Sequence, residues 1–459
     1  MNADQKITHV LDRLSLGARP GDRAQLEKLG IEAYIQAQLT SADQPASPEL
    51  ERRLSNLSTL SLTPLQLFEQ VNLPQNPSEA QKEQAREQQR KAFKEAQRAR
   101  LMRALESPHQ LQEVMTDFWF NHFNIFAQNN FTQVWIGDYE RSAIRPHALG
   151  KFRDLLGATA KHPAMLHYLN NWRNTAPGSP GARGPFRGLN ENYARELMEL
   201  HTLGINGGYT QADVETLART LTGWSIVHPR QPTTAASGFV FAADRHDQTS
   251  KTLLGQPLSQ TGLAEGEQAL DILAAHPSTA SHLSYKLAQF FVADEPPSSL
   301  VSYLSKRFLS TEGNIAKTLL ALFESDEFWD STHYQQKFKT PYQYILSMAR
   351  AIEVTAPSEE VLTRIGGLIS QLGMPLYRCR TPDGYKQTEV AWLSPDVMMR
   401  RVSMSMATAN IIRDSKPNPD ILLQTLENKL DANARSIIAN SPRPLQPALM
   451  LGSPSMMYR

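Results

Sequence analysis

Apolar residues recur at helical spacing along most of the chain. Positions three and four residues apart share one face of an α-helix, and apolar residues follow this period in one segment after another. Near the start, the pattern predicts helices at 6–15 and 21–39. After residue 260, it predicts helices at 265–275, 277–292, 298–309, 313–325, 340–354, 358–372, 394–412, 418–429 and 431–440. We therefore expect a mainly α-helical protein.

One predicted helix, residues 78–106, is almost entirely polar. It is rich in Ala, Gln, Glu, Lys and Arg and has little apolar content, so we expect an exposed, charged helix or arm. Acidic and basic residues alternate along it, which argues against a nucleic-acid-binding arm and leaves a mobile lid as an alternative.

The only convincing β signal lies at 238–255. Two phenylalanines alternate with other residues, a polar turn follows, and a second short apolar run begins at Thr252. The pattern predicts a small β-hairpin with His246 and Asp247 at its bend. These two side chains can orient a ligand or bind a metal, or they can form a simple Asp-stabilised turn.

Composition bounds the remaining possibilities. The chain has 459 residues, 41% of them hydrophobic, and a formal net charge of +1, as in a soluble globular protein. Length alone allows two or three domains, but we expect one large multi-helical domain, 1–459. The balanced charge gives no reason to expect nucleic acid as a partner, and no apolar run approaches the roughly 18 residues that a transmembrane segment needs. The single cysteine, Cys379, excludes an intramolecular disulfide.

The densest group of reactive side chains lies at 190–224, which predicts two helices joined by a glycine loop. One face of the first helix carries a polar stripe of Asn192, Arg195, Glu196 and Glu199. Tyr193 and His201 lie around the other, apolar side. The stripe is either a solvated, salt-bridged face or the wall of a cleft. In a cleft, two carboxylates one turn apart have their proton affinities pushed apart, as acid–base catalysis requires.

A second dense motif, TDFWFNHFNIF, predicts a helix with His122 on its apolar face and Asp117 and Asn121 on its polar face. A buried histidine beside polar groups is a common proton shuttle near neutral pH, and a satisfied core histidine is the alternative. Arg141 belongs to a basic stretch that can neutralise the predicted carboxylates or bind an anionic ligand.

No cofactor can be named from the sequence. It has no GxSxG elbow, HExxH helix, Rossmann glycine motif or Walker loop. The spacing of Glu196 and Glu199 matches a di-metal helix motif only in part. A metal therefore stays an open alternative, with candidate ligands Asp117, His122, Glu196, Glu199 and His246.

Several phrases of the sequence point to one family. They include HVLDRLSLGARPGD, DFWFNHFNIF, NENYARELMELHTLGINGGYTQADVETLARTLTGW, HDQTSKTLLG and HPSTASHLSYKLAQFFVADEPP. From His9 to the closing LGSPSMMYR, the chain resembles the domain of unknown function 1800 family. The chain differs from many relatives at 374–392, where RTPDGY replaces a loop that contains Gly-Trp.

The resemblance implies a cellular context but no reaction. Members are bacterial, commonly carry an export leader and are often encoded beside a sulfatase-like protein of the domain of unknown function 1501 family. The first residues here lack the features of a signal peptide. We therefore expect a periplasmic or extracellular protein if a leader has been removed, and a cytoplasmic one otherwise.

Three functional hypotheses remain. The first is an exported hydrolase or lyase that acts on a glycan or another polar substrate. Its catalytic residues would be Glu196, Glu199, His122, Tyr193 and Arg195, and its substrate-binding residues Asp117, Asn121, Asn192, Arg141, His246 and Asp247. The second is a non-catalytic assembly partner of the sulfatase-like protein that binds through helix 78–106. The third is a metal-dependent hydrolase or oxidoreductase.

Overall fold

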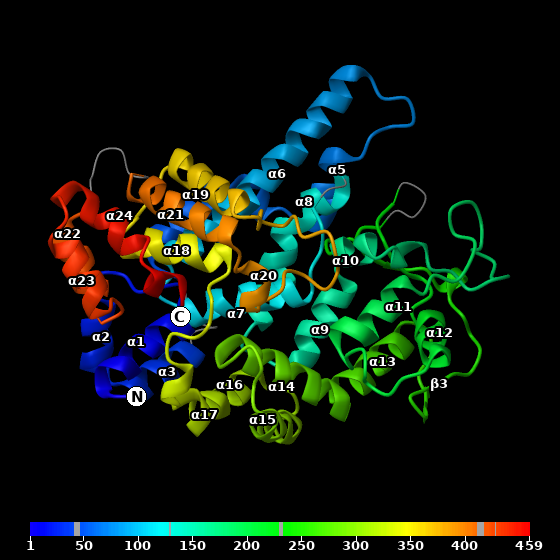
Figure 1. Ribbon diagram of the computed structural model, residues 1–459. Helices are drawn as coiled ribbons and strands as arrows, with labels where there is room; N and C mark the ends of the chain where they lie inside the picture. Colours follow the sequence, from blue (N-terminus) through cyan, green and yellow to red (C-terminus); the bar gives the residue numbers. More distant parts are fainter. Residues whose placement is uncertain (41–45, 128–129, 229–232, 411–416, 427) are drawn as a thin grey trace.

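Helices form nearly all of the regular structure (Figure 1). The computed structural model describes residues 1–40, 46–127, 130–228, 233–410, 417–426 and 428–459. The helices of the first half are α1 (Ala3–Leu14), α2 (Asp22–Leu29), α3 (Ile31–Leu39), α4 (Pro48–Ser55), α5 (Pro64–Val71), α6 (Glu79–Glu106), α7 (Gln110–His122), α8 (Asn130–Asp138), α9 (Phe152–Lys161), α10 (Pro163–Tyr168), α11 (Asn192–Glu196) and α12 (Gln211–Thr220). Those of the second half are α13 (Leu263–Ala275), α14 (Pro277–Phe291), α15 (Ser298–Ser310), α16 (Ile315–Phe323), α17 (Asp326–Trp329), α18 (Pro341–Ala351), α19 (Glu359–Gln371), α20 (Glu389–Trp392), α21 (Pro395–Ala409), α22 (Pro419–Leu426), α23 (Ala432–Ala439) and α24 (Gln446–Leu451). The prediction of a single, mainly α-helical domain is confirmed.

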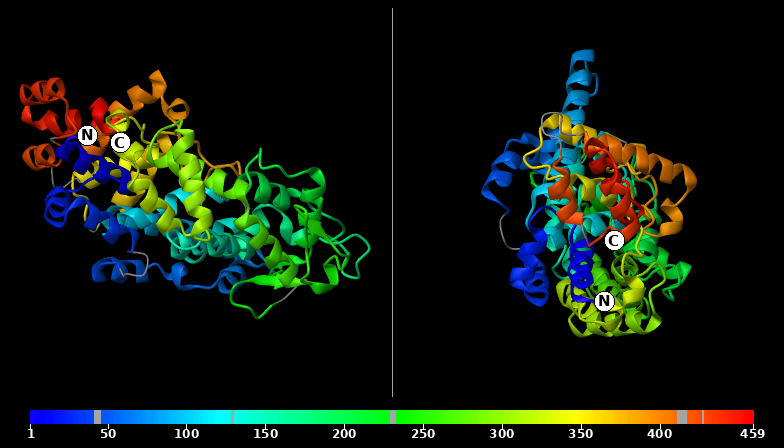
Figure 2. Two further views of the ribbon diagram at one scale, coloured as in Figure 1. Left: turned by 90° about the horizontal axis from the view of Figure 1, so that it is seen from below. Right: turned by 60° about the vertical axis from the view of Figure 1, so that its left-hand side comes forward.

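The molecule is elongated, and both termini lie at the same end (Figure 2). Helices α1, α2 and α22–α24 gather at that end, whereas α11–α13 lie at the other (Figure 1). The end of the chain is fastened by two main-chain hydrogen bonds, one from Lys337 N to Arg459 O at 3.2 Å and one from Arg459 N to Lys337 O at 2.8 Å. Within the ranges given above, no helix combines the length and the apolar character needed to cross a membrane.

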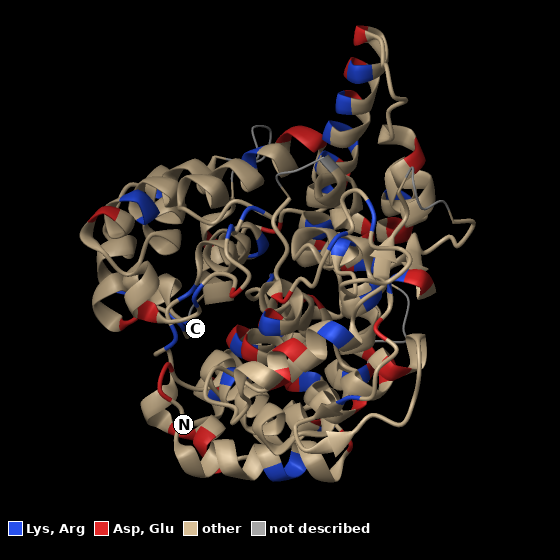
Figure 3. Ribbon diagram, turned by 90° about the vertical axis from the view of Figure 1, so that its right-hand side faces the viewer, with Lys and Arg blue, Asp and Glu red and all other residues tan. Residues whose placement is uncertain are grey.

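Helix α6 joins two different environments. It begins with a capping box between Ser78 and Gln81, and its first turns project from the body with acidic and basic side chains in alternation (Figure 3). From Ala92 onward, one side of the helix is buried. Alanines allow this half to approach α8 closely, because a Cβ placed on Gly137 would lie 3.0 Å from that of Ala96. The predicted arm is thus the N-terminal half of a helix whose other half is core.

The strands differ from the predicted hairpin in their pairing. Strand β2 (Phe239–Phe241) lies antiparallel to β1 (Trp224–Ile226), not to the run after Thr252. That run forms its own hairpin, β3 (Thr252–Leu253) with β4 (Gln256–Pro257). The expectation of one hairpin across 238–255 was therefore wrong. Leu254 and Gly255 have φ angles of 49° and 76°, the left-handed pair of a two-residue turn, so β3 closes on the residues that follow it.

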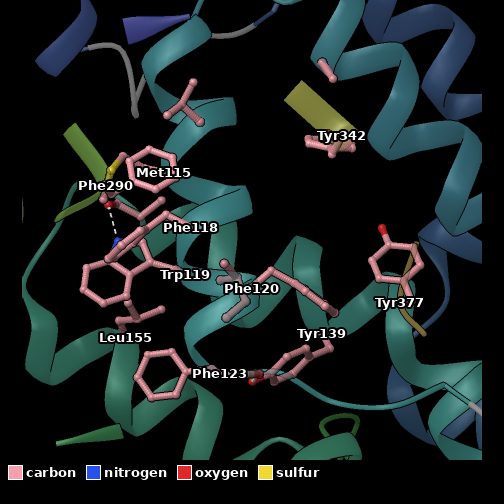
Figure 4. Packing of buried hydrophobic residues seen from close by; sticks show 14 of the residues in the cluster. Met115, Phe118, Trp119, Phe120, Phe123, Tyr139, Leu155, Phe290, Tyr342 and Tyr377 are labelled. Atoms are coloured by element: carbon pink, nitrogen blue, oxygen red, sulfur yellow. Dashed lines mark hydrogen bonds between the residues drawn. The ribbon is translucent and has the colours of Figure 1, made fainter. Parts of the chain in front are cut away.

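Helix α7 runs through the main core. Every residue from Gln110 to Phe120 is buried, and aromatic side chains surround the helix (Figure 4). The rings of Phe118 and Phe290 meet edge to face at 5.2 Å, and Trp119 donates a hydrogen bond to Ala148 O at 3.0 Å. A helix buried on all sides has fixed ends, so α7 can position the residues that follow it.

Candidate functional site

The polar stripe of residues 192–199 lies on α11 and on the π-helical turn Leu197–His201 that continues it. Tyr193 and His201 are each 1% exposed and face the core, as predicted. Asn192 is exposed, whereas Glu196 and the other two members of the stripe are partly buried. The stripe therefore lies at the surface without projecting freely into solvent.

Arg195 is held in a surface network. Its guanidinium lies 3.1 Å from Glu191 and 3.5 Å from Glu199, and it donates a hydrogen bond to Gln211 at 2.9 Å. Side-chain exposures of 40%, 36% and 27% for Arg195, Glu191 and Glu199 place these pairs in contact with water. This part of the stripe matches the solvated, salt-bridged interpretation.

Glu196 differs from its neighbours. It has no hydrogen-bond or ion-pair partner among the residues that the structure describes, although it is partly buried. Burial raises its pKa, and the nearby charges of Glu199 and Asp383 raise it further, while Arg195 opposes them. A carboxyl group in such surroundings can hold and release a proton closer to neutral pH than an ordinary glutamate.

Asp383 belongs to a loop that the end of α7 holds in place. Asn121 donates to Tyr385 O and accepts from Tyr385 N, both at 2.8 Å, and Asn124 donates to Thr381 O at 2.8 Å. Gly384 has a φ of +71°, and a Cβ there would lie 2.3 Å from Asn121 O. The motif asparagines thus fix residues 381–385 beside the stripe, and Asn121, predicted to bind substrate, binds this loop.

His122 lies beneath the stripe in a cluster of basic side chains. Its Nε2 lies 3.0 Å from His201 O, and its Nδ1 lies 2.8 Å from Lys286 Nζ. The rings of His201 and His282 are 6.0 Å and 6.2 Å from that of His122. Neither ring nitrogen of His201 has a hydrogen-bond partner among the described residues. Burial and the charge of Lys286 hold the pKa of His122 well below its ordinary value, so the imidazole is neutral.

Lys286 connects this cluster to the loop. It comes from α14, is partly exposed, and is influenced by two charges of the loop, Lys386 and Asp383. Burial first, and then Lys386, lower its pKa to about 8. Asp383 therefore acts on the charges of both Glu196 and Lys286.

Two predicted site residues serve the core instead of the stripe. Tyr193 is buried next to Tyr139, and burial raises its pKa. Asp117 is 3% exposed and forms an ion pair with Arg100 of α6. Neither side chain lies at the surface where a substrate would meet Glu196.

Three further candidates belong to other places. Arg141 pairs with Asp138 beside a cavity of about 490 Å³. His246 lies 3.2 Å from a Glu265 oxygen, and Asp247 accepts a hydrogen bond from Arg219 at 2.8 Å. Among the described residues, these partners are different from the residues that contact the stripe.

The candidate metal ligands are not brought together. In the part of the chain that the structure describes, no three His, Cys, Asp or Glu side chains form a group suited to a metal ion. Both ring nitrogens of His122 already face a neighbour, His201 O on one side and Lys286 on the other. The cluster is suited to proton transfer rather than to metal coordination.

Three residues of this arrangement were missed in the sequence. They are Lys286, His282 and Asp383. Lys286 lies one turn after His282 on the same face of α14, and this pair was the available signal. Its partner His122 lies 164 residues away, so no local pattern pointed to the contact.

Comparisons with known proteins give a family but no reaction. Neither the curated proteins nor the solved structures contain a match to this chain. One family profile, described as protein of unknown function (DUF1800), matches residues 9–458. The match spans nearly the whole described fold, including the stripe, the loop and Lys286. The chain therefore belongs to this DUF1800 family.

Proposed function

We propose that this protein is an enzyme that acts on a polar substrate by acid–base catalysis, with Glu196 as the proton-transferring carboxyl group. The observation that carries the proposal is a partly buried Glu196 without a hydrogen-bond or ion-pair partner among the described residues, with Asp383 acting on its charge and on that of Lys286. Their surroundings raise the pKa of the acid and lower that of the base, so both move toward neutrality. Acid–base catalysis needs groups that exchange protons near the working pH.

A glycan is the substrate class that we propose. Glu196 lies near Glu199 and near the phenol of Tyr168, whose pKa is raised by burial first, then by Cys379 and Glu196. Paired carboxylates beside aromatic side chains suit cleavage of a glycosidic bond by hydrolysis or elimination. The family context implies export, so we propose that the protein works in the periplasm or outside the cell.

A panel of neutral and acidic polysaccharides tests this proposal. Hydrolysis is followed by new reducing ends, and elimination by ultraviolet absorbance of the unsaturated product. On any glycan that the wild type cleaves, Glu196→Gln should lower kcat by roughly 10²-fold or more, because the proton can no longer be transferred. Glu215→Gln is the matched control, since Glu215 is an exposed glutamate on the next helix, α12.

The alternative outcomes are distinct. Unchanged kcat for Glu196→Gln would remove Glu196 from the mechanism, and a wild type inactive on the whole panel would count against glycans. Circular dichroism and thermal melting of both variants should match the wild type, because neither substitution removes a core contact.

The projecting half of α6 supports a second candidate, an assembly role with a co-exported sulfatase-like protein. Its exposed charges pair along the helix, with Glu83 2.7 Å from Arg90, and the helix extends beyond the body (Figure 3). Reversing Arg86 and Arg90 to Glu should abolish co-purification of a complex with the neighbouring gene's product. The same reversal of Arg400, an exposed arginine of α21, should leave such a complex intact.

A further inference from the structure

The amine of Lys286 is held against a neutral imidazole. A carbonyl oxygen can only accept a hydrogen bond, so His122 Nε2, 3.0 Å from His201 O, carries the ring proton. The lone pair of His122 Nδ1 therefore points at Lys286 Nζ, 2.8 Å away. The lysine donates to this nitrogen, and the same nitrogen can take up its proton.

Lys286 lacks the carboxylate partner that three buried lysines have. Lys251 lies 2.9 Å from Glu265, and Lys337 and Lys429 are each paired with an aspartate. No carboxylate lies within ion-pair distance of Lys286 in the described ranges; its one hydrogen-bond partner there is His122. Loss of water without a counter-ion disfavours the charged ammonium, so it favours the free amine.

Lys339 is a second lysine without a counter-ion among the described residues, and it differs from Lys286 in its exposure to solvent. Among the described residues, the amine of Lys339 contacts a neutral group, Ser347 Oγ at 2.9 Å, but Lys339 is 3% exposed. Lys286 is partly exposed, and the charge of Asp383 acts on it. Of these two lysines, Lys286 is the one whose side chain reaches the surface.

We propose that Lys286 is a nucleophilic amine that forms an imine with a carbonyl group of a polar substrate, such as the open-chain form of a sugar, and that His122 relays the proton. The geometry supplies a partly exposed lysine, a proton acceptor in contact with its amine and a fixed loop whose Asp383 acts on its charge. Desolvated lysines with such neighbours are the ones that react with carbonyl groups.

The step balances without a further reactant. The free amine attacks the carbonyl carbon, a C–N bond forms, and the C=O π electrons move to oxygen. The amine proton passes through His122 Nδ1 to that oxygen, giving a carbinolamine. The remaining amine proton then passes through His122 Nδ1 to the hydroxyl group, which leaves as water while the nitrogen lone pair forms the C=N bond. The products are one imine and one water molecule.

Protonation supports this assignment. A pKa of about 8 leaves about one tenth of Lys286 as free amine at pH 7. An ordinary lysine, with a pKa of about 10.5, has about one part in three thousand. At equal access, Lys286 should react with an aldehyde on the order of a hundred times faster than an exposed lysine.

Reductive labelling of the whole protein at pH 7 tests the inference. Formaldehyde or glyceraldehyde is added with cyanoborohydride, and the labelled lysines are quantified by peptide mass spectrometry. We expect Lys286 to be labelled at least tenfold faster than Lys306, an exposed lysine of α15, by both probes. Equal or slower labelling of Lys286 by formaldehyde would overturn the nucleophilic amine. Faster labelling by formaldehyde alone would overturn the polar carbonyl substrate.

His122 has its own test as a positioning residue. For the wild type, the labelling rate of Lys286 should rise with a midpoint near pH 8. His122→Gln should shift that midpoint and slow the proton relay, whereas a purely structural role would leave the midpoint unchanged. The midpoint of Lys306 in the same samples is the internal control.

The inference rests on the proposed function in one respect, that the carbonyl compound is the substrate of the enzyme. Separate experiments can refute the imine at Lys286 and the acid–base role of Glu196. Glu196→Gln should abolish turnover and leave labelling of Lys286 intact. If Glu196 proves essential while Lys286 is unreactive, the result supports acid–base catalysis and refutes the imine. If Lys286 is reactive and Glu196→Gln keeps full activity, the carboxyl assignment falls.

Discussion

Two polar clusters adjoin α7. In the closed cluster, around Arg100, the cation has carboxylate partners. In the open cluster, around Lys286, the cation has none within ion-pair distance among the described residues. Arg100 is paired with Asp117 and lies 3.0 Å from Glu140, so two carboxylates compensate its charge. Lys286 faces the neutral ring of His122 and no carboxylate within ion-pair distance among the described residues. Both cations lose water on burial, but only Arg100 gains charged partners. The cluster around Arg100 therefore joins helices, whereas the cluster around Lys286 leaves an amine without a charged partner beside the loop that carries Asp383.

The closed cluster joins segments distant in sequence. The guanidinium of Arg100 lies over the rings of Phe120, Tyr342 and Tyr377 at 5.0–5.2 Å, and Tyr377 donates a hydrogen bond to Glu140 at 3.0 Å. These contacts connect α6, α7, α18 and the segment after α19. A cation between carboxylates and aromatic faces has lost its water but kept strong partners.

Breaking the closed cluster should have the largest effect. Arg100→Met leaves Asp117 and Glu140 buried without their cation, and we expect a loss of about 3–5 kcal/mol in the free energy of unfolding. Urea denaturation followed by circular dichroism measures it. Arg90→Met, on the exposed half of the same helix, should leave the midpoint unchanged. If Arg100→Met does not fold, Arg100→Lys should fold with an intermediate loss. Wild-type stability of either Arg100 variant would show that the cluster does not join the helices.

Releasing the loop should have a smaller effect. Asn121→Ala removes both hydrogen bonds to Tyr385, and we expect a loss of about 1–2 kcal/mol in the free energy of unfolding. Limited trypsin digestion should cut faster after the exposed Arg380, because the loop is no longer held. Asn206→Ala, at an exposed position, is the control. Unchanged cleavage at Arg380 would mean that other contacts hold the loop.

The faces of the stripe helix were predictable, and the assembly of the clusters was not. Helical period placed Tyr193 and His201 inside and the polar stripe outside. The period of a helix indicates which face is buried but not which segment covers it. Asn121 meets Tyr385 across 264 residues.

The strands show the same limit. Alternation located β2, yet a strand of three residues pairs with whichever segment the surrounding helices bring alongside, and here that is β1. Likewise, the acidic stripe could be drawn from spacing alone. The pKa of Glu196 also depends on Asp383, which comes from the far part of the chain on a loop that Asn121 of α7 holds.

The lowered pKa of Lys286 in the open cluster should make the free energy of unfolding depend on pH. Folded Lys286 releases its proton near pH 8, whereas the unfolded chain keeps it until about pH 10.5. Between these values the unfolded state binds more protons, so the free energy of unfolding of the wild type should rise relative to Lys286→Met. Because water partly screens this side chain, we expect about 1 kcal/mol. Urea denaturation at pH 7, 9 and 10.5 measures the difference. A constant difference would mean that Lys286 titrates like a surface lysine.

Removing charge from the projecting half of α6 should have the smallest effect. Glu83 pairs with Arg90 at 2.7 Å and with Arg86 at 3.6 Å, but all three side chains are more than half exposed. Water already solvates these charges, so their attraction is offset by the side-chain entropy lost on pairing. Glu83→Gln should leave the urea midpoint unchanged at low salt and at about 1 M salt, where exposed charges are screened. A salt-dependent loss as large as that of Arg100→Met would mean that pairing, and not burial, distinguishes the closed cluster from the exposed pairs.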